Sequence, residues 1–185
     1  MYMYAQPRWG LGQPHPAQLG FVTLSPEVRG EAYVRWVQRA LNNSGSCLTV
    51  DGKDTQVYRE AVKRFQDSVG LTPHGMVDAP TQDALIMANE RNLGYVLWLQ
   101  TVLARLHDAG TLGIPSVPQI ERDRAKLGPG TRAAIRAFQR RLAEGAMHPT
   151  GLPVKITLKV DGVVGPKTET SLAEFAASEP PGECI

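Results

Sequence analysis

The sequence predicts a mainly α-helical protein built from two tandem three-helix lobes, with short loops and at most a minor strand element. The first observation behind this prediction is an internal repeat. The stretch Y-V-R-W-V-Q-R-A-L at Tyr33 returns as Y-V-L-W-L-Q-T-V-L at Tyr95, and A-V-K-R-F-Q in the first copy returns as A-I-R-A-F-Q in the second. The second observation is that apolar residues in both copies follow the three- and four-residue spacing of an amphipathic helix. Such repetition indicates repeated structural units.

The repeat divides the chain of 185 residues into four parts. Residues 1–24 are rich in Pro, Gly and Gln and are expected to form an extended leader. The first lobe covers residues 25–92, and the second covers residues 93–177 with two insertions. Residues 178–185 form a tail that we expect to be unstructured.

Three helices are expected in the first lobe, over residues 31–42, 56–69 and 80–90. Ser25, followed by Pro26, is typical of a residue that caps the start of a helix. Between the first two helices, Asp51-Gly52 predicts a tight turn. The Asp carboxylate accepts hydrogen bonds from nearby backbone amides, and Gly tolerates a positive φ.

Three more helices are expected in the second lobe, over residues 95–108, 131–144 and 166–176. The insertions are residues 109–126 and 145–153. After the second insertion, the run from Val154 to Val160 alternates apolar and polar residues, which makes it the best strand candidate in the chain.

Composition argues against several classes of protein. The formal net charge of +2 is too small to indicate nucleic-acid binding by itself. No apolar run approaches the length of a membrane span, and the N-terminus lacks the charged region and apolar core of a secretory signal. Cys47 and Cys184 are too few for a disulfide framework or a thiolate zinc site. They are able to pair with each other, but free and structurally neutral cysteines are the favoured interpretation.

No catalytic site is expected. The four histidines are scattered and form none of the motifs H-x-H, H-x-x-E or H-E-x-x-H. Cys47 has no neighbouring His in the sequence to activate it, and the carboxylates are interpreted as ordinary helix-surface charges rather than a glycosidase pair. We therefore predict that the protein is not an enzyme and holds no metal and no cofactor.

The order of the elements, with D-G between helices and F-Q on the middle helix, resembles the peptidoglycan-binding domain of bacterial and phage cell-wall proteins. The resemblance covers residues 31–88 and, with two insertions, residues 94–176. It implies a three-helix fold for each lobe and binding to the bacterial wall. The second lobe departs from the family pattern at its first turn, where Arg124-Ala125 stands in place of Asp-Gly. Its second turn, at Asp161-Gly162, is complete.

Asp51 and Asp161 are candidate ligand-binding residues because each begins one of these turns. The favoured alternative is that each carboxylate accepts hydrogen bonds from its own turn. Gln66 and Gln139, beside the two core phenylalanines, are expected to bond loop backbone rather than a ligand.

Trp36 and Trp98 are further candidates, and they occupy the same position in the two repeats. At about 100° per residue, each lies about 200° around its helix from the apolar stripe, away from the three-helix core. Such an indole must cover the other repeat, the leader, a partner or a sugar ring. We favour packing within the chain, with Trp98 between the lobes and Trp36 against Trp9 or Phe21 of the leader.

Arg132, Arg136 and Arg140 follow one another at four-residue spacing and form a row on one helix face. Such a row is suited to gripping carboxylates, for example those of a peptidoglycan stem peptide or of an acidic partner. The favoured interpretation is a solvated helix face.

The first functional hypothesis is a non-catalytic module that targets a partner or a complex to the wall by binding the glycan strand or the stem peptide of peptidoglycan. The alternative is a protein-interaction adaptor or structural component of a phage tail or contractile injection system. Nucleic acid and membrane are not expected partners, and the sequence predicts no oligomeric state. Without a secretory signal, the protein is expected to be made in the cytoplasm and to reach the wall by non-classical export, phage lysis or injection.

Overall fold

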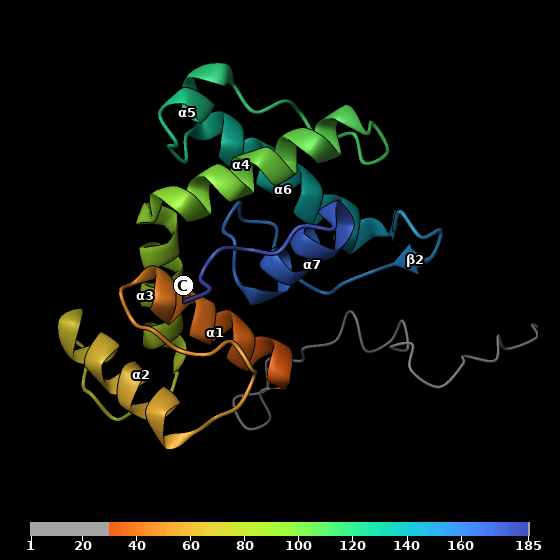
Figure 1. Cartoon of the computed structure of the whole chain (residues 1–185). Helices are drawn as coiled ribbons and strands as arrows, with labels where there is room; N and C mark the ends of the chain where they lie inside the picture. The colour runs from red at the N-terminus through yellow and green to blue at the C-terminus, as the bar shows by residue number, and fades with distance from the viewer. Residues whose placement is uncertain (1–29, 185) are drawn as a thin grey trace, which may run out of the picture.

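A computed structural model describes residues 30–184 of the chain. The expectations for the leader over residues 1–24, for the helix start at Ser25 and for contact between Trp36 and the leader fall outside this part. Within it the protein is mainly helical, as predicted, and two groups of three helices lie one above the other (Figure 1).

The first lobe consists of α1 (Glu31–Asn43), α2 (Gln56–Ser68) and α3 (Ala79–Arg91). Side chains cap two of these helices. Thr55 accepts a hydrogen bond from the backbone of Tyr58 at the start of α2, and Asp78 accepts one from the backbone of Thr81 in α3. The buried side chains of the three helices form one cluster, which includes Trp36, Val37, Leu41, Val62, Phe65 and Leu85.

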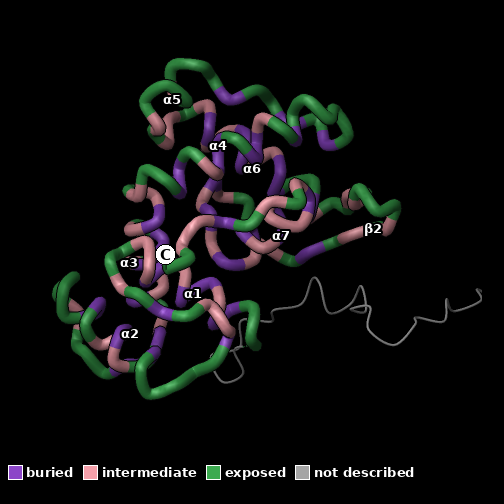
Figure 2. The backbone as a smooth tube through the Cα atoms, in the orientation of Figure 1, coloured by how far each residue is buried: buried purple, intermediate pink, exposed green. Residues whose placement is uncertain are grey.

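The second lobe consists of α4 (Leu93–Asp108), α6 (Pro129–Glu144) and α7 (Pro166–Ala176). Its cluster includes Leu99, Leu103, Ile135, Phe138, Leu172 and Phe175. The rings of Phe138 and Phe175 meet edge to face with their centroids 5.6 Å apart, a favourable arrangement of aromatic rings. Buried positions lie on the inward sides of the helices in both lobes (Figure 2). Each predicted helix is therefore present, with its ends within two residues of those expected.

The insertions of the second lobe contain structure that the sequence did not predict. The first forms the short helix α5 (Gln119–Asp123) and buries Leu112, Ile114 and Val117 in the core of the lobe. The second forms a hairpin of β1 (Ala146–Met147) and β2 (Pro153–Val154). The strand predicted over residues 154–160 is wrong beyond Val154. Ile156 does point into the core, but the segment has no neighbouring strand to complete a ladder.

A single residue, Asn92, joins the two lobes. It ends α3 and caps α4, because its Oδ1 accepts a hydrogen bond from Tyr95 N at 2.9 Å. Its Nδ2 donates to the carbonyl of Asn43, at the end of α1, at 3.0 Å. The amide thus ties the start of the second lobe to the first helix of the first lobe.

The tail after α7 is ordered up to Cys184, and the prediction that it is unstructured is wrong for these residues. It runs back along α1, where Asn42 Nδ2 donates to Gly182 O at 2.7 Å. Cys184 forms a disulfide with Cys47, in the loop after α1, with their Cα atoms 5.2 Å apart. The favoured interpretation of free cysteines is therefore also wrong. The two cysteines lie 137 positions apart in the sequence, so no local sequence pattern indicates that they pair.

No helix within residues 30–184 is long and apolar enough to cross a bilayer.

Candidate functional site

Four buried glutamines hold the turns between the helices. Each lies on the helix that precedes a turn, and each is at most 3% exposed; they are Gln38 on α1, Gln66 on α2, Gln100 on α4 and Gln139 on α6. A buried amide needs partners for both its oxygen and its NH2 group. For Gln38, Gln66 and Gln139 the nearby turn supplies both. For Gln100 it supplies partners for the NH2 group alone, and within residues 30–184 the buried Oε1 accepts no hydrogen bond. In all four cases the side chain fixes the turn against the helix.

In the first lobe, the glutamine oxygen accepts a hydrogen bond from a glycine of the turn. Gln38 Oε1 accepts from Gly52 N at 2.8 Å, and Gln66 Oε1 accepts from Gly75 N at 2.9 Å. Both glycines have positive φ, 78° and 81°. At each, an added Cβ would come within 3.0 to 3.2 Å of the neighbouring helix. Glycine in these turns therefore allows the turn backbone to pack closely against the preceding helix.

The second turn of the second lobe repeats this construction. Gln139 Oε1 accepts from Gly162 N at 2.9 Å, and its Nε2 donates to Val163 O at 2.9 Å and to Thr168 Oγ1 at 3.3 Å. The prediction that Gln66 and Gln139 bond loop backbone is confirmed.

The first turn of the second lobe uses a different residue, because Arg124-Ala125 replaces the Asp-Gly. Glu121 on α5 accepts hydrogen bonds from Gly130 N at 2.9 Å and from Thr131 N at 2.8 Å, and it thereby caps α6. Burial raises the pKa of Glu121, but the hydrogen bonds from Thr131 and Gly130 outweigh burial and hold the pKa below its usual range. Sequence reasoning missed this role, because Glu121 comes before the turn rather than in it.

The candidate carboxylates Asp51 and Asp161 bond their own turns. Asp51 Oδ1 accepts from Gln38 Nε2 at 2.8 Å and from Lys53 N at 3.0 Å, and these hydrogen bonds lower its pKa. Asp161 Oδ1 accepts from Val163 N at 2.9 Å. Both carboxylates therefore accept hydrogen bonds from their own turns, which is the favoured alternative to a ligand-binding role.

Trp36 is completely buried, so a ligand in solvent does not reach it. The prediction that it faces away from the core is wrong, because the indole belongs to the core cluster of the first lobe. The physical reason is that α1 packs on two sides, against α3 of its own lobe and against α7 of the other. A residue far from the apolar stripe is then buried by the second contact.

Trp98 packs within the chain, as favoured from the sequence, but its contacts are with the core of its own lobe and with the tail rather than between the lobes. It is partly buried against the core of the second lobe, and its Nε1 donates to Ser178 Oγ in the tail at 3.2 Å. Its ring lies 5.6 Å from that of Tyr95. The two tryptophans share a repeat position, but their surroundings differ: Trp36 is completely buried on α1, whereas Trp98 is partly buried and contacts the tail.

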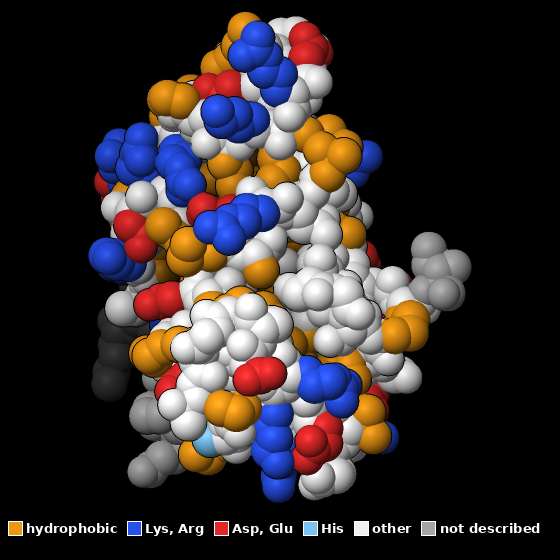
Figure 3. All heavy atoms as spheres, turned by 90° about the vertical axis from the view of Figure 1, so that its left-hand side faces the viewer, with side chains coloured by type: hydrophobic (Ala, Val, Ile, Leu, Met, Phe, Trp, Pro, Cys, Tyr) orange, Lys and Arg blue, Asp and Glu red, His pale blue; other side chains and the backbone are white. Residues whose placement is uncertain are grey.

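The arginine row of α6 is divided between two environments. Arg132 forms a two-pronged ion pair with Glu90 of α3, at 2.9 and 3.2 Å, and thus links the lobes. The hydrogen bond to Glu90 raises the pKa of Arg132. Arg136 is half-buried beside Gly162, and Arg140 is exposed. Figure 3 shows Lys and Arg side chains gathered over the second lobe. Arg122 of α5, and Arg124 and Lys126 just after it, are exposed.

A buried polar cluster that the sequence did not reveal lies between the lobes. Glu169 of α7 is 1% exposed, accepts a hydrogen bond from Tyr95 OH at 2.7 Å and lies 3.6 Å from Arg39 Nε of α1. Burial raises the pKa of Glu169 to about 7, although the charge of Arg39 opposes this shift. The Trp36 N–H also favours the ionised carboxylate, although no hydrogen bond of standard geometry joins the two side chains.

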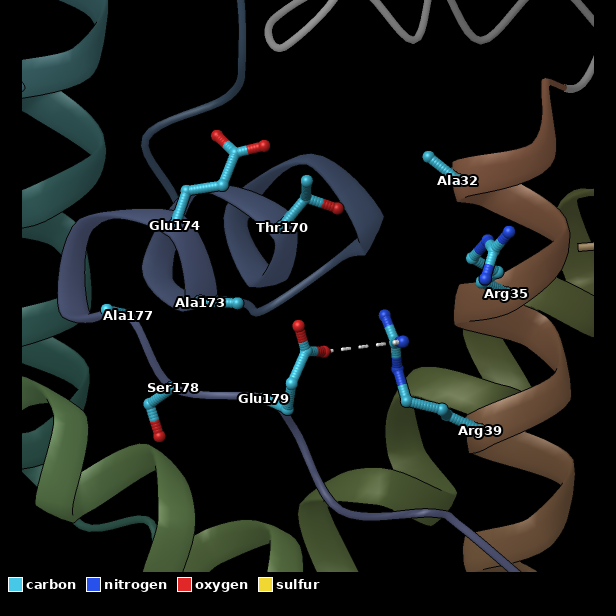
Figure 4. A pocket seen from close by; sticks show the side chains of 9 residues that line it. All are labelled: Ala32, Arg35, Arg39, Thr170, Ala173, Glu174, Ala177, Ser178 and Glu179. Atoms are coloured by element: carbon cyan, nitrogen blue, oxygen red, sulfur yellow. Dashed lines mark ion pairs between the residues drawn. The ribbon is translucent and has the colours of Figure 1, made fainter. Parts of the chain in front are cut away.

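A pocket of about 390 Å³ has Arg39 of this cluster in its lining, and we call it the interlobe pocket. Its lining residues are Ala32, Arg35 and Arg39 of α1, Thr170, Ala173 and Glu174 of α7, and Ala177, Ser178 and Glu179 of the tail. Figure 4 shows α1 and α7 on opposite sides of the opening. None of the sequence-predicted candidates lines it, because the pocket exists only where the two lobes meet.

The histidines of residues 30–184 have local partners. His74 lies 3.2 Å from Asp78, His107 contacts the carbonyl of Ile114, and His148 contacts Thr150. Across this described part, no group of three or more His, Cys, Asp or Glu side chains is placed to hold a metal ion.

Residues 30–85 match the model of a protein family whose description is "Putative peptidoglycan binding domain". The match covers α1, α2 and the first half of α3, and the second lobe lies outside it. Comparison with curated proteins finds no match, and comparison with solved structures finds none either.

Proposed function

Taking as the premise that residues 30–85 carry a peptidoglycan-binding domain, we propose that both lobes together form a non-catalytic module that holds a partner or a larger complex on bacterial peptidoglycan. The family match of the first lobe is the observation that carries this proposal. Wall binding by the second lobe is part of the proposal, not of the match.

The glutamine-held turns support extending the proposal to the second lobe. Gln139 bonds the turn at Gly162 in the same way that Gln38 bonds the turn at Gly52. The same core and turn construction therefore occurs twice, although the family model covers only the first copy.

The disulfide between Cys47 and Cys184 supports a site of action outside a reducing cytosol. Disulfides persist mainly in oxidising compartments and on cell surfaces. A module that leaves the cytoplasm by export, phage lysis or injection meets such conditions at the wall.

Sedimentation with purified, insoluble peptidoglycan tests the proposal. The full chain, with its disulfide intact, should pellet with the peptidoglycan and stay in the supernatant without it. The supernatant of the same sample should contain no muropeptides or reducing ends above those of a heat-treated control. Protein that remains soluble at every peptidoglycan concentration contradicts wall binding, and released fragments contradict the non-catalytic role.

The adaptor hypothesis is favoured by a different observation. Three large apolar side chains on adjoining helices are exposed, Met87 on α3 and Leu93 and Leu97 on α4. Exposed apolar groups of this kind are common at protein contacts. The test is a Leu93→Ser, Leu97→Ser double variant and a partner identified with the wild-type chain. If the variant still sediments with peptidoglycan but no longer binds that partner, the adaptor role belongs to these exposed side chains.

A further inference from the structure

The interlobe pocket has walls of opposite charge. Arg35 and Arg39 project from α1, and Glu174 and Glu179 stand on the side of α7 and the tail (Figure 4). Its volume of about 390 Å³ is at the small end of the range in which proteins bind small ligands, roughly 300–1,000 Å³. Because each wall belongs to a different part of the chain, the charge pattern is a property of the assembled lobes.

One cation and one anion of the pocket lack a buried partner of opposite charge. Arg35 lies 3.7 Å from the exposed Glu31 and 3.4 Å from the carbonyl of Val50, both long contacts. Glu174 is half-buried, and within residues 30–184 its carboxylate makes no hydrogen bond and no ion pair. Such a carboxylate has lost part of its hydration without gaining a compensating charge.

Arg39 differs from Arg35 in having a buried carboxylate as its partner, and Glu179 is an exposed residue of the tail near Arg39. Arg39 lies 3.6 Å from the buried Glu169 and 4.0 Å from Glu179 in the tail. The charge of Arg39 is therefore largely matched from within the chain. Arg35 and Glu174 remain on facing walls, and the structure shows no ion pair between them.

We propose that the interlobe pocket binds a small zwitterionic ligand, whose carboxylate pairs with Arg35 and whose ammonium group pairs with Glu174. A guanidinium is suited to bidentate pairing with a carboxylate, and a half-buried carboxylate is suited to an ammonium group. Thr170 and Ser178 add hydroxyl groups to the lining. Amino acids and short peptides with free charged groups have this chemistry.

The titration of Glu174 is consistent with this assignment. Burial raises its pKa to about 7, since the low-dielectric surroundings disfavour the charged form. The charged groups around it are Arg35 and Arg39 from α1 and Glu179 from the tail. A ligand ammonium group supplies the nearby positive charge that stabilises the ionised carboxylate.

Two sources offer such a ligand, a peptidoglycan stem peptide and a free amino acid or peptide. The stem peptide is the source that follows if the chain binds the wall, so this part of the inference rests on the proposed function. The zwitterion-binding chemistry of the pocket rests on the structure alone.

Calorimetric titration of the full, oxidised chain with a defined stem tripeptide tests the chemistry. Three forms of the same peptide serve as probes: one with free charged groups, one with its amines acetylated and one with its carboxylates amidated. The free form should bind, and each blocked form should bind at least 10-fold more weakly, which corresponds to about 1.4 kcal/mol. Equal affinities for all three forms, or no binding of the free form at 10 mM, would overturn the proposal.

Matched variants locate the binding in the pocket. Glu174→Gln should weaken binding of the free peptide about 10-fold but leave binding of the acetylated peptide unchanged, since the acetylated probe has no ammonium group to pair with Glu174. Arg35→Gln should likewise weaken binding of the free peptide about 10-fold but leave binding of the amidated peptide unchanged, since that probe has no carboxylate to pair. Arg140→Gln, on the exposed face of α6, is the control and should bind like the wild type. If either pocket variant binds every probe like the wild type, the pocket is not the site. The comparison of blocked probes on the wild-type chain needs no variant to fold.

Parallel sedimentation with insoluble peptidoglycan separates the two sources and the two proposals. Loss of sedimentation in Glu174→Gln and Arg35→Gln, with the wild type bound, supports the stem peptide as the source. Wild-type sedimentation that both variants retain leaves the proposed function standing and contradicts the pocket as its wall site. Binding of the free tripeptide and of single amino acids without sedimentation assigns the pocket to soluble zwitterions and contradicts wall binding.

Discussion

Ala125 occupies a position at which the other turns of the fold use glycine. Gly52, Gly75 and Gly162 have φ values of 78°, 81° and 79°, and Ala125 has a φ of 43°. The left-handed region costs a residue with a Cβ roughly 1–2 kcal/mol. The first turn of the second lobe therefore carries backbone strain that its three counterparts avoid.

Ala125→Gly should stabilise the protein by about 0.5–1 kcal/mol, because relief of the strain exceeds the entropy that glycine gains in the unfolded chain. The measurement is the free energy of unfolding in urea. The matched control is Gly162→Ala, where an added Cβ lies 2.9 Å from Arg136 and 3.1 Å from the carbonyl of Arg132. This change should destabilise by more than about 1 kcal/mol, and two changes of the same sign would contradict the argument.

At the scale of single elements, Glu121 shows how an insertion compensates for a lost motif. Its carboxylate caps α6 from outside the helix, with contacts to Gly130 N, Thr131 N and Thr131 Oγ1 between 2.7 and 2.9 Å. Capping side chains and buried hydrogen bonds each contribute on the order of 1 kcal/mol. The insertion that contains α5 thus supplies the cap of α6 and stabilises the second lobe.

Glu121→Ala should therefore destabilise the protein by about 1–3 kcal/mol, as judged from thermal and urea unfolding. Glu121→Gln keeps one oxygen acceptor and should cost less. An exposed residue of the same short helix, Arg122, provides the control, and Arg122→Ala should change the stability by less than about 0.5 kcal/mol. Equal losses for the Glu121 and Arg122 variants would show that α5 itself, rather than the cap, matters.

The same elements show what the sequence predicts and what it does not. The six long helices follow from local apolar spacing and turn residues, and Gln66 and Gln139 follow from their place beside the core phenylalanines. The place of Trp36 in the core does not follow, since it depends on α7 reaching α1 from the other end of the chain. The interlobe pocket is missed for the same reason: Arg35 and Glu174 meet only after the lobes have packed.

For the whole molecule, the interface between the lobes makes stability depend on pH. Burial raises the pKa of Glu169 to about 7 from an ordinary value of 4.5. The folded protein then binds a proton more tightly than the unfolded chain. The resulting stability is fully present below about pH 4.5 and is lost as the pH rises through about 7.

The free energy of unfolding should accordingly fall between pH 5 and pH 8, by an amount on the order of 1–3 kcal/mol from Glu169. Glu169→Gln keeps an acceptor for the Tyr95 hydroxyl but does not titrate, so its unfolding energy should depend less on pH in this range. A variant as steep as the wild type would assign the dependence to other groups, of which Glu174, with a pKa of about 7, is the next to test.

The disulfide between Cys47 and Cys184 holds the tail on the first lobe. Closing a loop of this length restricts the unfolded chain, and disulfides commonly stabilise by about 2–5 kcal/mol. Reduction should lower the urea midpoint by a corresponding amount. A Cys47→Ser, Cys184→Ser double variant should resemble the reduced protein and show no response to reductant, whereas an unchanged midpoint of the wild type on reduction would contradict the stabilising role.

The position of this disulfide also decides how the protein responds to mechanical tension. When the chain is pulled from residues 30 and 184, the disulfide between Cys47 and Cys184, which are 137 positions apart, transmits the force directly and bypasses the chain between them. At 3.3–3.6 Å per residue, about 450–490 Å of contour length is then withheld from extension. Only the stretch from Gly30 to Cys47, most of it α1, can unravel. A load borne between a cell wall and an anchored partner would thus be supported by a sulfur–sulfur bond once α1 has unravelled, with the hydrophobic core of the second lobe out of the line of force.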